Sequence, residues 1–503
     1  MEKRFEFKSI VSFLLILIPI TLNFIFFENN ESSVLVTARA FFSPDFIKND
    51  WWLSTGIEYG NLFNYFAGGM YELIGYTNTY FIGRLIVYFC WSGLLWTFFK
   101  RLKISPFLYP LLICVIQKNQ TMGFGEWMLS GFETKTFAYL SFFMALLMFR
   151  KGYIKTTSFL FGLSVSFHIL VGFYLTISTF LVSLIYQEFR QKFYVNTKNV
   201  AFNLLSFTLG AIFGILALLA WIKSGENISD KIYLLGSMIY TTKRVAHHVM
   251  FKFNGKLIFF SSIIFLMIFY FKNKVLPTEV RLLLRVATWT SLFLIPAYIL
   301  TKLELYQYLK YYFARVPDAL IPFVTITLGF AIISNLICRL KNKAFQNYLM
   351  IFFVLSGLGR SAYKMTKGKE LWELKEAVRK DQVFQWIKKK TKKTDTFLIL
   401  PTDQSFYVNA QRPIFVAFKH SPQKEVHLVE WMRRLQVING GKSPGSQSWS
   451  LQYEVAENLK KLKEDQIKKI MTENNLQYAI FPNTIKKNLN IAFASQEFTV
   501  YQP

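Results

Sequence analysis

Long apolar stretches recur along the first 360 residues of the chain, and they limit the folds that it can adopt. A helix that crosses a bilayer needs roughly 20 mainly apolar residues, or fewer where helices are short or broken. Eleven stretches approach this pattern, at about 9–27, 79–99, 104–118, 133–149, 155–169, 170–187, 200–222, 256–272, 282–300, 316–337 and 345–359. With 53% hydrophobic residues and 54 phenylalanines, the chain is expected to be a polytopic α-helical membrane protein with about eleven transmembrane helices.

The fifth and sixth stretches are short and meet at His168 without a hydrophilic loop between them. This arrangement predicts either a tight hairpin or one interrupted helix. A histidine at this depth in an apolar run is a candidate functional residue, because ionisable groups are costly inside a membrane. The alternative is a hydrogen-bonded packing residue.

The basic residues lie mostly in short clusters between the apolar stretches, such as Lys100–Lys103, Arg150–Lys155 and Arg339–Lys343. Such clusters mark cytoplasmic loops, so they predict a cytoplasmic N-terminus and an extracytoplasmic C-terminus. The net charge of +28 therefore fits membrane topology, and nucleic acid is not expected as a partner. The predicted outer loop 223–255 is also basic, which invites a functional explanation.

The pattern changes after about residue 360, where apolar stretches of membrane length end. Short strands are predicted at four apolar segments: TFLILP, RPIFVAF, LQYAIFP and FTVYQP. Three segments have helical periodicity: Leu371–Lys390, VHLVEWMRRLQVI and VAENLKKLKEDQIKKIMTENN. We therefore expect two domains, a transmembrane domain at 1–360 and a small extracytoplasmic α/β domain at 361–503.

Polar residues of the predicted outer loops form the candidate site. They are Asp45, Asp50, Glu126, Glu133, Lys135, His168, Arg244, His247, His248, Lys310, Arg315 and Asp318. A carboxylate beside several cations suits transfer from a phosphate-linked donor, because the carboxylate deprotonates an acceptor while the cations neutralise the leaving phosphate. We expect Arg244, His247, His248 and Arg315 to approach one another across an outward-facing cavity.

Other interpretations of these residues remain open. Asp50, which precedes two tryptophans, could cap an interfacial helix. Glu126, Glu133, His247 and His248 could hold a divalent metal ion such as Zn or Mn. Glu133 and Lys135 are two positions apart and would not share a helical face, so they are not expected to pair with each other if that helix starts early. Arg315 is expected at the start of a helix, because Pro317 is tolerated in a first turn.

Five segments of the chain carry a resemblance to known proteins: PDFIKNDWW, GFETKTFAY, SFHILVGF, RVAHHV and RVPDALIP. In these segments the chain resembles a family of uncharacterised bacterial integral membrane proteins. That family is similar to the GT-C superfamily of glycosyltransferases, which use polyprenyl-phosphate sugars. The resemblance covers most of 1–360, and Glu430–Arg434 fits the α/β tail of the same family. It implies a location in the bacterial cytoplasmic membrane and a catalytic acidic residue in the first outer loop. Asp50 matches that position best, Asp45 second, and Glu133 is a third candidate, although the chain has no adjacent pair of acidic residues there.

The resemblance implies a membrane glycosyltransferase that moves a sugar from a polyprenyl-phosphate-linked donor to an envelope glycan, lipid or protein. The donor phosphate would be bound by six residues: Lys135, His168, Arg244, His247, His248 and Arg315. Two alternatives stay open: a non-catalytic GT-C-like subunit of envelope biogenesis, and a transporter or flippase of a lipid-linked glycan. A transporter should carry ionisable residues near the membrane midplane in paired broken helices. Here they gather at one edge, and only His168 approaches the interior.

Overall fold

The computed structural model describes residues 2–26, 30–56, 60–193, 197–223, 228–272, 276–375 and 382–503. Its first part is helical. The elements are α1 (Glu2–Phe24), α2 (Glu31–Phe42), α3 (Trp51–Ser54), α4 (Asn61–Arg101), η1 (Pro106–Leu108), α5 (Tyr109–Lys118), α6 (Thr134–Arg150), α7 (Ile154–Phe167), α8 (Ile169–Ile185), α9 (Gln187–Phe193), α10 (Thr197–Lys223), α11 (Asp230–Met238), η2 (Ile239–Arg244), α12 (Ala246–Val249), α13 (Gly255–Phe271), α14 (Thr278–Thr290), η3 (Ser291–Phe293), α15 (Leu294–Lys302), α16 (Tyr306–Leu309), α17 (Arg315–Cys338) and α18 (Lys343–Lys375).

Each of the eleven apolar stretches lies on a helix, but the count of eleven spans is not confirmed. Within the described residues, five helices are long and apolar enough to cross a membrane, and six if the bent pair α8 and α9 counts as one span. The five are Phe7–Phe24, Asn61–Arg101, Asn199–Lys223, Thr278–Lys302 and Arg315–Cys338. The helices α6 and α7 have only 17 and 14 residues, about 26 and 21 Å at 1.5 Å per residue. Together the apolar helices make this chain a helical membrane protein.

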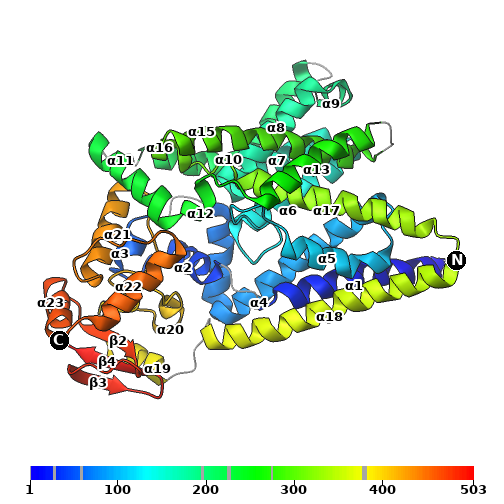
Figure 1. Ribbon diagram of the computed structural model, residues 1–503. Helices are drawn as coiled ribbons and strands as arrows, with labels where there is room; N and C mark the ends of the chain where they lie inside the picture. Colours follow the sequence, from blue (N-terminus) through cyan, green and yellow to red (C-terminus); the bar gives the residue numbers. More distant parts are fainter. Residues whose placement is uncertain are drawn as a thin grey trace.

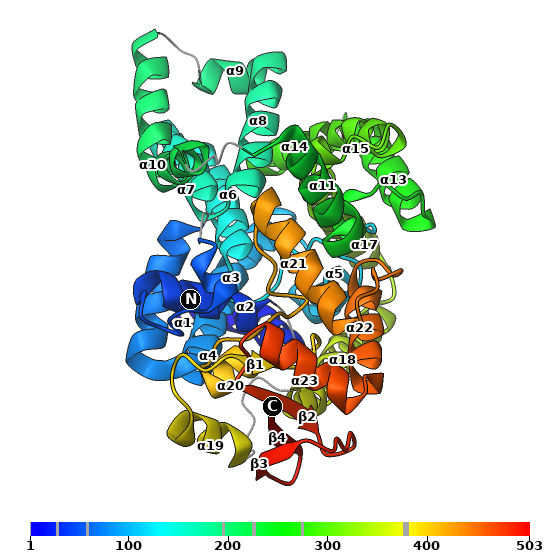
Figure 2. The same cartoon turned by 90° about the vertical axis from the view of Figure 1, so that its left-hand side faces the viewer.

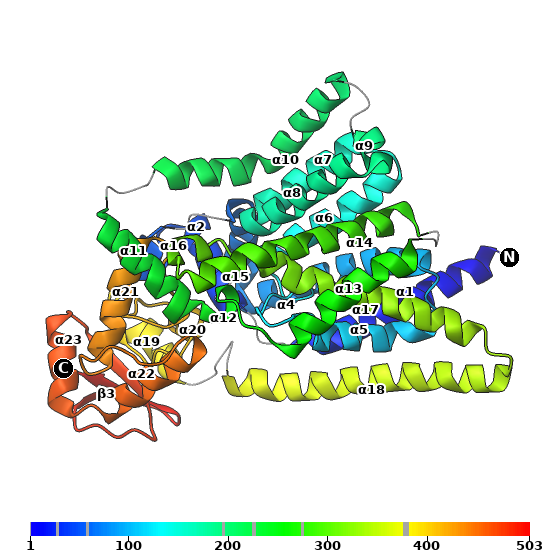
Figure 3. The same cartoon turned by 45° about the horizontal axis from the view of Figure 1, so that its top comes forward.

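The helices form one bundle. The N-terminus and the turn between α17 and α18 lie at one end of the bundle, and the C-terminal residues lie at the other end (Figure 1). Figure 3 shows α18 running along one side toward the C-terminal residues, with α10 on the opposite side. The helices α7 and α10 pack closely, because Gly162 faces the carbonyl of Phe207 and Gly210 faces that of Phe159. Small residues permit such backbone approach in membrane bundles.

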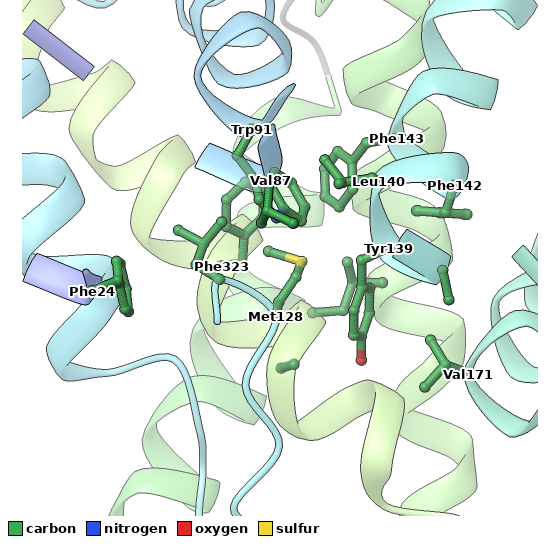
Figure 4. Packing of buried hydrophobic residues seen from close by; sticks show 14 of the residues in the cluster. Phe24, Val87, Trp91, Met128, Tyr139, Leu140, Phe142, Phe143, Val171 and Phe323 are labelled. Carbon is green, nitrogen blue, oxygen red and sulfur yellow. The ribbon is translucent and has the colours of Figure 1, made fainter. Parts of the chain in front are cut away.

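Aromatic side chains fill the centre of the bundle. Trp91 of α4 packs edge-on against Phe143 of α6, with ring centroids 5.4 Å apart, and Phe143 packs against Phe323 of α17 at 5.2 Å. Figure 4 shows this cluster, with Tyr139 on the same helix as Phe143 and its hydroxyl directed away from Phe142 and Phe143. These contacts fix α6 against α17, the two helices that carry much of the candidate site.

The pair α7 and α8 forms a tight hairpin, the first of the two arrangements that the sequence allowed. His168 alone links the helices, with extended backbone angles (φ −150°, ψ 105°). Gly172 lies against the backbone of Ser164 and Val165, so the chain reverses within a few residues. His168 therefore lies at the tip of the hairpin.

Residues 382–503 form an α/β unit, which we call the C-terminal unit. It contains α19 (Gln382–Lys390), β1 (Phe397–Leu398), α20 (Phe406–Ala410), α21 (Glu425–Ile438), α22 (Trp449–Lys461), α23 (Glu464–Glu473), β2 (Tyr478–Pro482), β3 (Asn490–Ala494) and β4 (Phe498–Gln502). The sheet order is β1-β2-β4-β3; β1 pairs parallel with β2, and the other pairs are antiparallel. Figure 2, viewed from this end, shows α21 beside α11 of the bundle.

Three of the four predicted strands are confirmed, and RPIFVAF is a correction. That segment makes only one parallel bridge, between Ile414 and Phe397, and on its other side Ile414 N donates to Asp50 of the bundle. The strand β3 was not predicted. The helix expected at Leu371–Lys390 is observed as the end of α18 and as α19, while 376–381 lie outside the described residues. The helix α18 continues unbroken past residue 360.

Candidate functional site

A buried carboxylate on α17 organises the loop between α5 and α6. Asp318 is fully buried and accepts hydrogen bonds from the hydroxyl of Thr121 (2.6 Å) and from four backbone N–H groups. These groups belong to Met122, Gly123, Phe124 and Glu126, at 2.6, 3.0, 3.1 and 2.9 Å. Successive backbone N–H groups form a concavity that suits an anion, and here a side chain of the same protein fills it. The loop is thereby fixed to the first turn of α17.

Arg315 lies one turn before Asp318 and forms an ion pair with Glu126, which belongs to the same α5–α6 loop. Its Nε lies 3.0 Å from Oε2 of Glu126, whose exposed fraction is 1%. Its Nη1 donates a 3.1 Å hydrogen bond to Nε2 of His168, which must be an unprotonated acceptor since arginine only donates. The guanidinium also lies over the ring of Tyr312, 4.3 Å from its centroid. The prediction that Arg315 begins a helix is confirmed.

The adjacent histidines His247 and His248 lie on α12, with ring centroids 3.9 Å apart. Burial and the charges of Arg244 and Lys252 lower the pKa of His247 to about 4. Burial and the neighbouring His247 and Arg315 lower the pKa of His248 well below its usual value. Both rings are therefore neutral at pH 7, and they offer hydrogen bonds rather than positive charge to a phosphate.

The two histidines face different partners. Nδ1 of His248 donates to the carbonyl oxygen of Phe124 in the α5–α6 loop, and Gly125 packs directly on this ring. Nδ1 of His247 is hydrogen bonded to Ser448 of the C-terminal unit. The pair thus connects the Asp318-bound loop with the C-terminal unit.

Glu133 and Lys135 form an ion pair, which corrects the expectation that they would not meet. Nζ of Lys135 lies 3.5 Å from Oε1 of Glu133. The reason is that Glu133 precedes α6 with extended backbone angles (φ −148°, ψ 162°), so helical spacing does not apply to it. Glu133 also accepts hydrogen bonds from Ser130 (2.7 Å) and Asn30 (3.2 Å). Both charges are at least nine-tenths buried.

Asp50 caps α3, as the alternative interpretation of the sequence proposed. Its Oδ1 accepts a hydrogen bond from Leu53 N at 2.9 Å. Its Oδ2 accepts from the Tyr407 hydroxyl at 2.7 Å and from Ile414 N at 3.1 Å, both in the C-terminal unit. Burial raises the pKa of Asp50 to about 6, and the three hydrogen bonds act in the opposite direction. Asp45, in contrast, has a side chain that is 92% exposed, 3.6 Å from Lys48.

Arg244 and Arg315 point to different partners. Arg244 donates to Ser421 Oγ (3.0 Å) and to the carbonyl of Lys419 (3.2 Å), so it joins η2 to the C-terminal unit. Lys310 forms an ion pair with Glu425 of α21. The structure therefore brings Glu126, His168, His248 and Arg315 together, while it places Arg244, Lys310 and Asp50 at the contact with the C-terminal unit.

The proposed metal ligands do not form a metal cluster. In the part of the chain that the structure describes, no group of three or more His, Cys, Asp or Glu side chains is arranged to hold a metal ion. Glu126 is paired with Arg315, and Glu133 with Lys135.

Several residues at the site were not singled out from the sequence. Tyr139 of α6 lies in electrostatic range of Glu126, Arg315 and Asp318, but it looks like any aromatic residue in an apolar stretch. Tyr407 and His420 in the C-terminal unit carry no local signal. Arg84 was visible as an arginine inside an apolar stretch, which is a functional or structural signal by itself.

Comparisons with known proteins gave one family model that matches a short segment and one similar solved structure. A family model described as a domain of unknown function, DUF6798, matches residues 380–438. No curated protein matches the chain. Among solved structures, the chain is similar to the crystal structure of the Archaeoglobus fulgidus oligosaccharyltransferase tethered with an acceptor peptide, with a TM-score of 0.42 and 11% identity over 94% of this chain and 68% of that chain.

The segment matched by DUF6798 carries much of the contact between the C-terminal unit and the bundle. It contains the groups that bind Asp50, Arg244 and Lys310, and it contains Arg434, whose guanidinium lies 4.2 Å from the ring centre of Trp51. In this chain the matched segment is therefore a docking element.

Proposed function

We propose that the chain is a membrane glycosyltransferase that moves a sugar from a polyprenyl-phosphate-linked donor to an envelope acceptor. The reaction takes place at the membrane edge that faces the C-terminal unit. One observation carries the proposal: a buried carboxylate, an arginine and neutral histidines converge at the end of a bundle of apolar helices. Such a site combines a proton acceptor with donors for a leaving phosphate.

The basic residues around this site support a phosphate-linked donor. Lys135 lies in electrostatic range of His168 and His248. Arg244 and Lys252 lie in range of His247. Because His247 and His248 are neutral at pH 7, we assign the charge that attracts the phosphate to the arginines and lysines, and we assign hydrogen bonding to the histidines.

The roles of the acidic residues follow from their partners. We assign Asp50 to docking, because its oxygens already accept hydrogen bonds from α3 and from the C-terminal unit. Glu133 holds Lys135 in place. Asp45, which is exposed and lies beside Lys48, is assigned no catalytic part.

The proposal is tested in a strain that lacks the protein, by mass spectrometry of envelope glycans and of lipid-linked sugars. The expected result is the loss of one glycan, accumulation of its polyprenyl-linked sugar, and recovery of both with the wild-type chain. A transporter would be supported instead if the deletion strain makes the same lipid-linked sugars as the wild type but distributes them differently between the two membrane leaflets. Restoration of the glycan by a variant lacking both Glu126 and Arg315 would support a non-catalytic subunit.

A further inference from the structure

We propose that Glu126 is the catalytic base of this transfer and that Asp318 is its positioning residue. The inference rests on the proposed function and deepens it by naming the group that takes the acceptor's proton. It stands on the juxtaposition of Glu126 with Tyr139 and Arg315, and on the double attachment of Glu126 to α17.

Glu126 has a carboxylate oxygen that no neighbour uses. Its Oε2 forms the ion pair with Arg315, its Oε1 is left over, and neither oxygen makes a hydrogen bond to any described residue. The hydroxyl of Tyr139 is also buried and makes no hydrogen bond within the described part of the chain. A buried polar group without a hydrogen-bond partner destabilises the fold, so two of them in one electrostatic neighbourhood point to a polar ligand. An alcohol has the chemistry that both groups need, since a hydroxyl can accept a hydrogen bond from Tyr139 and donate one to Glu126.

The position of Glu126 is fixed from two sides by one turn of α17. Asp318 accepts the backbone N–H of Glu126 at 2.9 Å, and Arg315 pairs with its side chain at 3.0 Å. Residues three apart on a helix face the same way, so both contacts come from one surface. Catalytic groups gain from such support, because a base must lie within about 3 Å of the proton that it removes.

The proposed step balances as follows. The acceptor hydroxyl oxygen forms a bond to the anomeric carbon of the donor sugar, and the bond from that carbon to the phosphate oxygen breaks. The hydroxyl proton goes to Oε1 of Glu126, and the electron pair of the broken bond stays on the polyprenyl phosphate. Glu126 later returns its proton to water. No oxidant or reductant is needed, because no atom changes its oxidation state.

The experiment uses the full-length protein and three variants. Glu126→Gln removes the base while an amide can still face Arg315, Glu126→Asp keeps the charge on a shorter side chain, and Asp318→Asn cannot accept all five hydrogen bonds. The control is Glu279→Gln. Glu279 is another fully buried carboxylate, which lies 3.3 Å from Arg101 and 3.7 Å from Arg150 at the far end of α6.

Two quantities are measured for each protein. The first is the binding of farnesyl phosphate to purified protein in nanodiscs, as a probe of the phosphate site. The second is the rate of glycan formation in membranes of the complemented deletion strain between pH 5 and 9. We expect Glu126→Gln to lower the rate about 100-fold or more at every pH with unchanged farnesyl phosphate binding. Glu126→Asp should retain a reduced rate, and Asp318→Asn should shift the acid limb of the pH profile. Glu279→Gln should change neither quantity.

The outcomes separate this inference from the proposed function. If the wild-type protein neither binds farnesyl phosphate nor restores the glycan, the proposed function fails. If it does both and Glu126→Gln works at the wild-type rate, Glu126 is not the base. If Glu126→Gln does not accumulate in the membrane, Glu126→Asp decides, because a wild-type rate and pH profile in that variant contradict the need for a precisely placed base.

Discussion

The hydroxyl of Tyr407 donates a 2.7 Å hydrogen bond to the carboxylate of Asp50, and this bond joins residues 357 positions apart in the chain. The same carboxylate accepts the backbone N–H groups of Leu53 and Ile414. One buried side chain thus caps a short helix of the bundle and holds the C-terminal unit against it. Because hydrogen bonds to buried charged groups contribute more than neutral ones, Asp50 is a sensitive point for testing the contact.

We expect Asp50→Asn to loosen the C-terminal unit. An amide cannot accept all three hydrogen bonds, so the free energy of unfolding should fall by about 1–3 kcal/mol. The measurement is thermal unfolding in detergent together with limited proteolysis in the C-terminal unit. Asp45→Asn in the same loop is the matched control, because that side chain is exposed. Equal protease resistance of both variants would show that Asp50 does not hold the unit.

We expect His420 to make the protein less stable in acid. This ring is buried between Trp52 and Tyr407, with centroids 4.5 and 4.7 Å away. Burial, together with the charges of Lys419 and Arg244, lowers its pKa to about 3. As the pH falls below about 6.5, His420 therefore takes up a proton in the unfolded state but not in the folded state, and the free energy of unfolding decreases. The loss from this group is about 2 kcal/mol between pH 8 and pH 5.

The variant His420→Phe tests this assignment, because phenylalanine fills the aromatic site without titrating. Unfolding of both proteins is followed between pH 8 and pH 5. As the pH is lowered, the free energy of unfolding should fall more steeply for the wild-type protein than for the variant, and the difference should grow toward pH 5. Parallel curves would mean that His420 does not contribute to the acid dependence.

We expect the C-terminal unit to be extracytoplasmic. The basic clusters between the apolar stretches predict a cytoplasmic N-terminus, and the N-terminus and the C-terminal unit lie at opposite ends of the bundle (Figure 1). A green fluorescent protein fused after Pro503 should stay dark, and alkaline phosphatase fused there should be active. The reverse pattern would place the unit in the cytoplasm.

The sequence predicted the helices well because apolar stretches report local structure. Every predicted span lies on a helix, and α17 begins at Arg315 as expected. Partners far apart in the chain could not be predicted, since a single sequence does not reveal which distant segments meet. For this reason the sequence allows both a catalytic and a capping role for Asp50, but it does not reveal the hydrogen bonds from Tyr407 and Ile414.

Two local errors have physical reasons. Glu133 and Lys135 were judged by helical spacing, but the helix starts after Glu133 and the pair forms across its N-terminus. The apolar run RPIFVAF predicts a strand, but it pairs with β1 at a single bridge, and on its other side Ile414 N donates to Asp50 instead of to a further strand. In both cases a boundary or a distant partner overrode the local pattern.

Arg84 provides a last test, because it is a buried charge in a helix of membrane length. Its side chain is fully buried and forms an ion pair of 2.7 Å with Glu31. It also donates to the carbonyl oxygens of Phe24 and Ile25 at the end of α1. Arg84→Met leaves the Glu31 carboxylate buried and unpaired, which typically costs about 3–5 kcal/mol. We expect a correspondingly large drop in thermal stability and in the amount of folded protein.

A second substitution separates the charge from the packing. In the double variant Glu31→Gln with Arg84→Met, no unpaired charge remains, so part of the lost stability should return. Glu72→Gln serves as the control, because Glu72 pairs with Arg39 but its own side chain is 43% exposed, and such pairs contribute about 0–1 kcal/mol. Thermal unfolding of the four proteins in one detergent gives the comparison. If the double variant is as unstable as Arg84→Met alone, the hydrogen bonds from Arg84 to the end of α1, rather than the ion pair, account for its contribution.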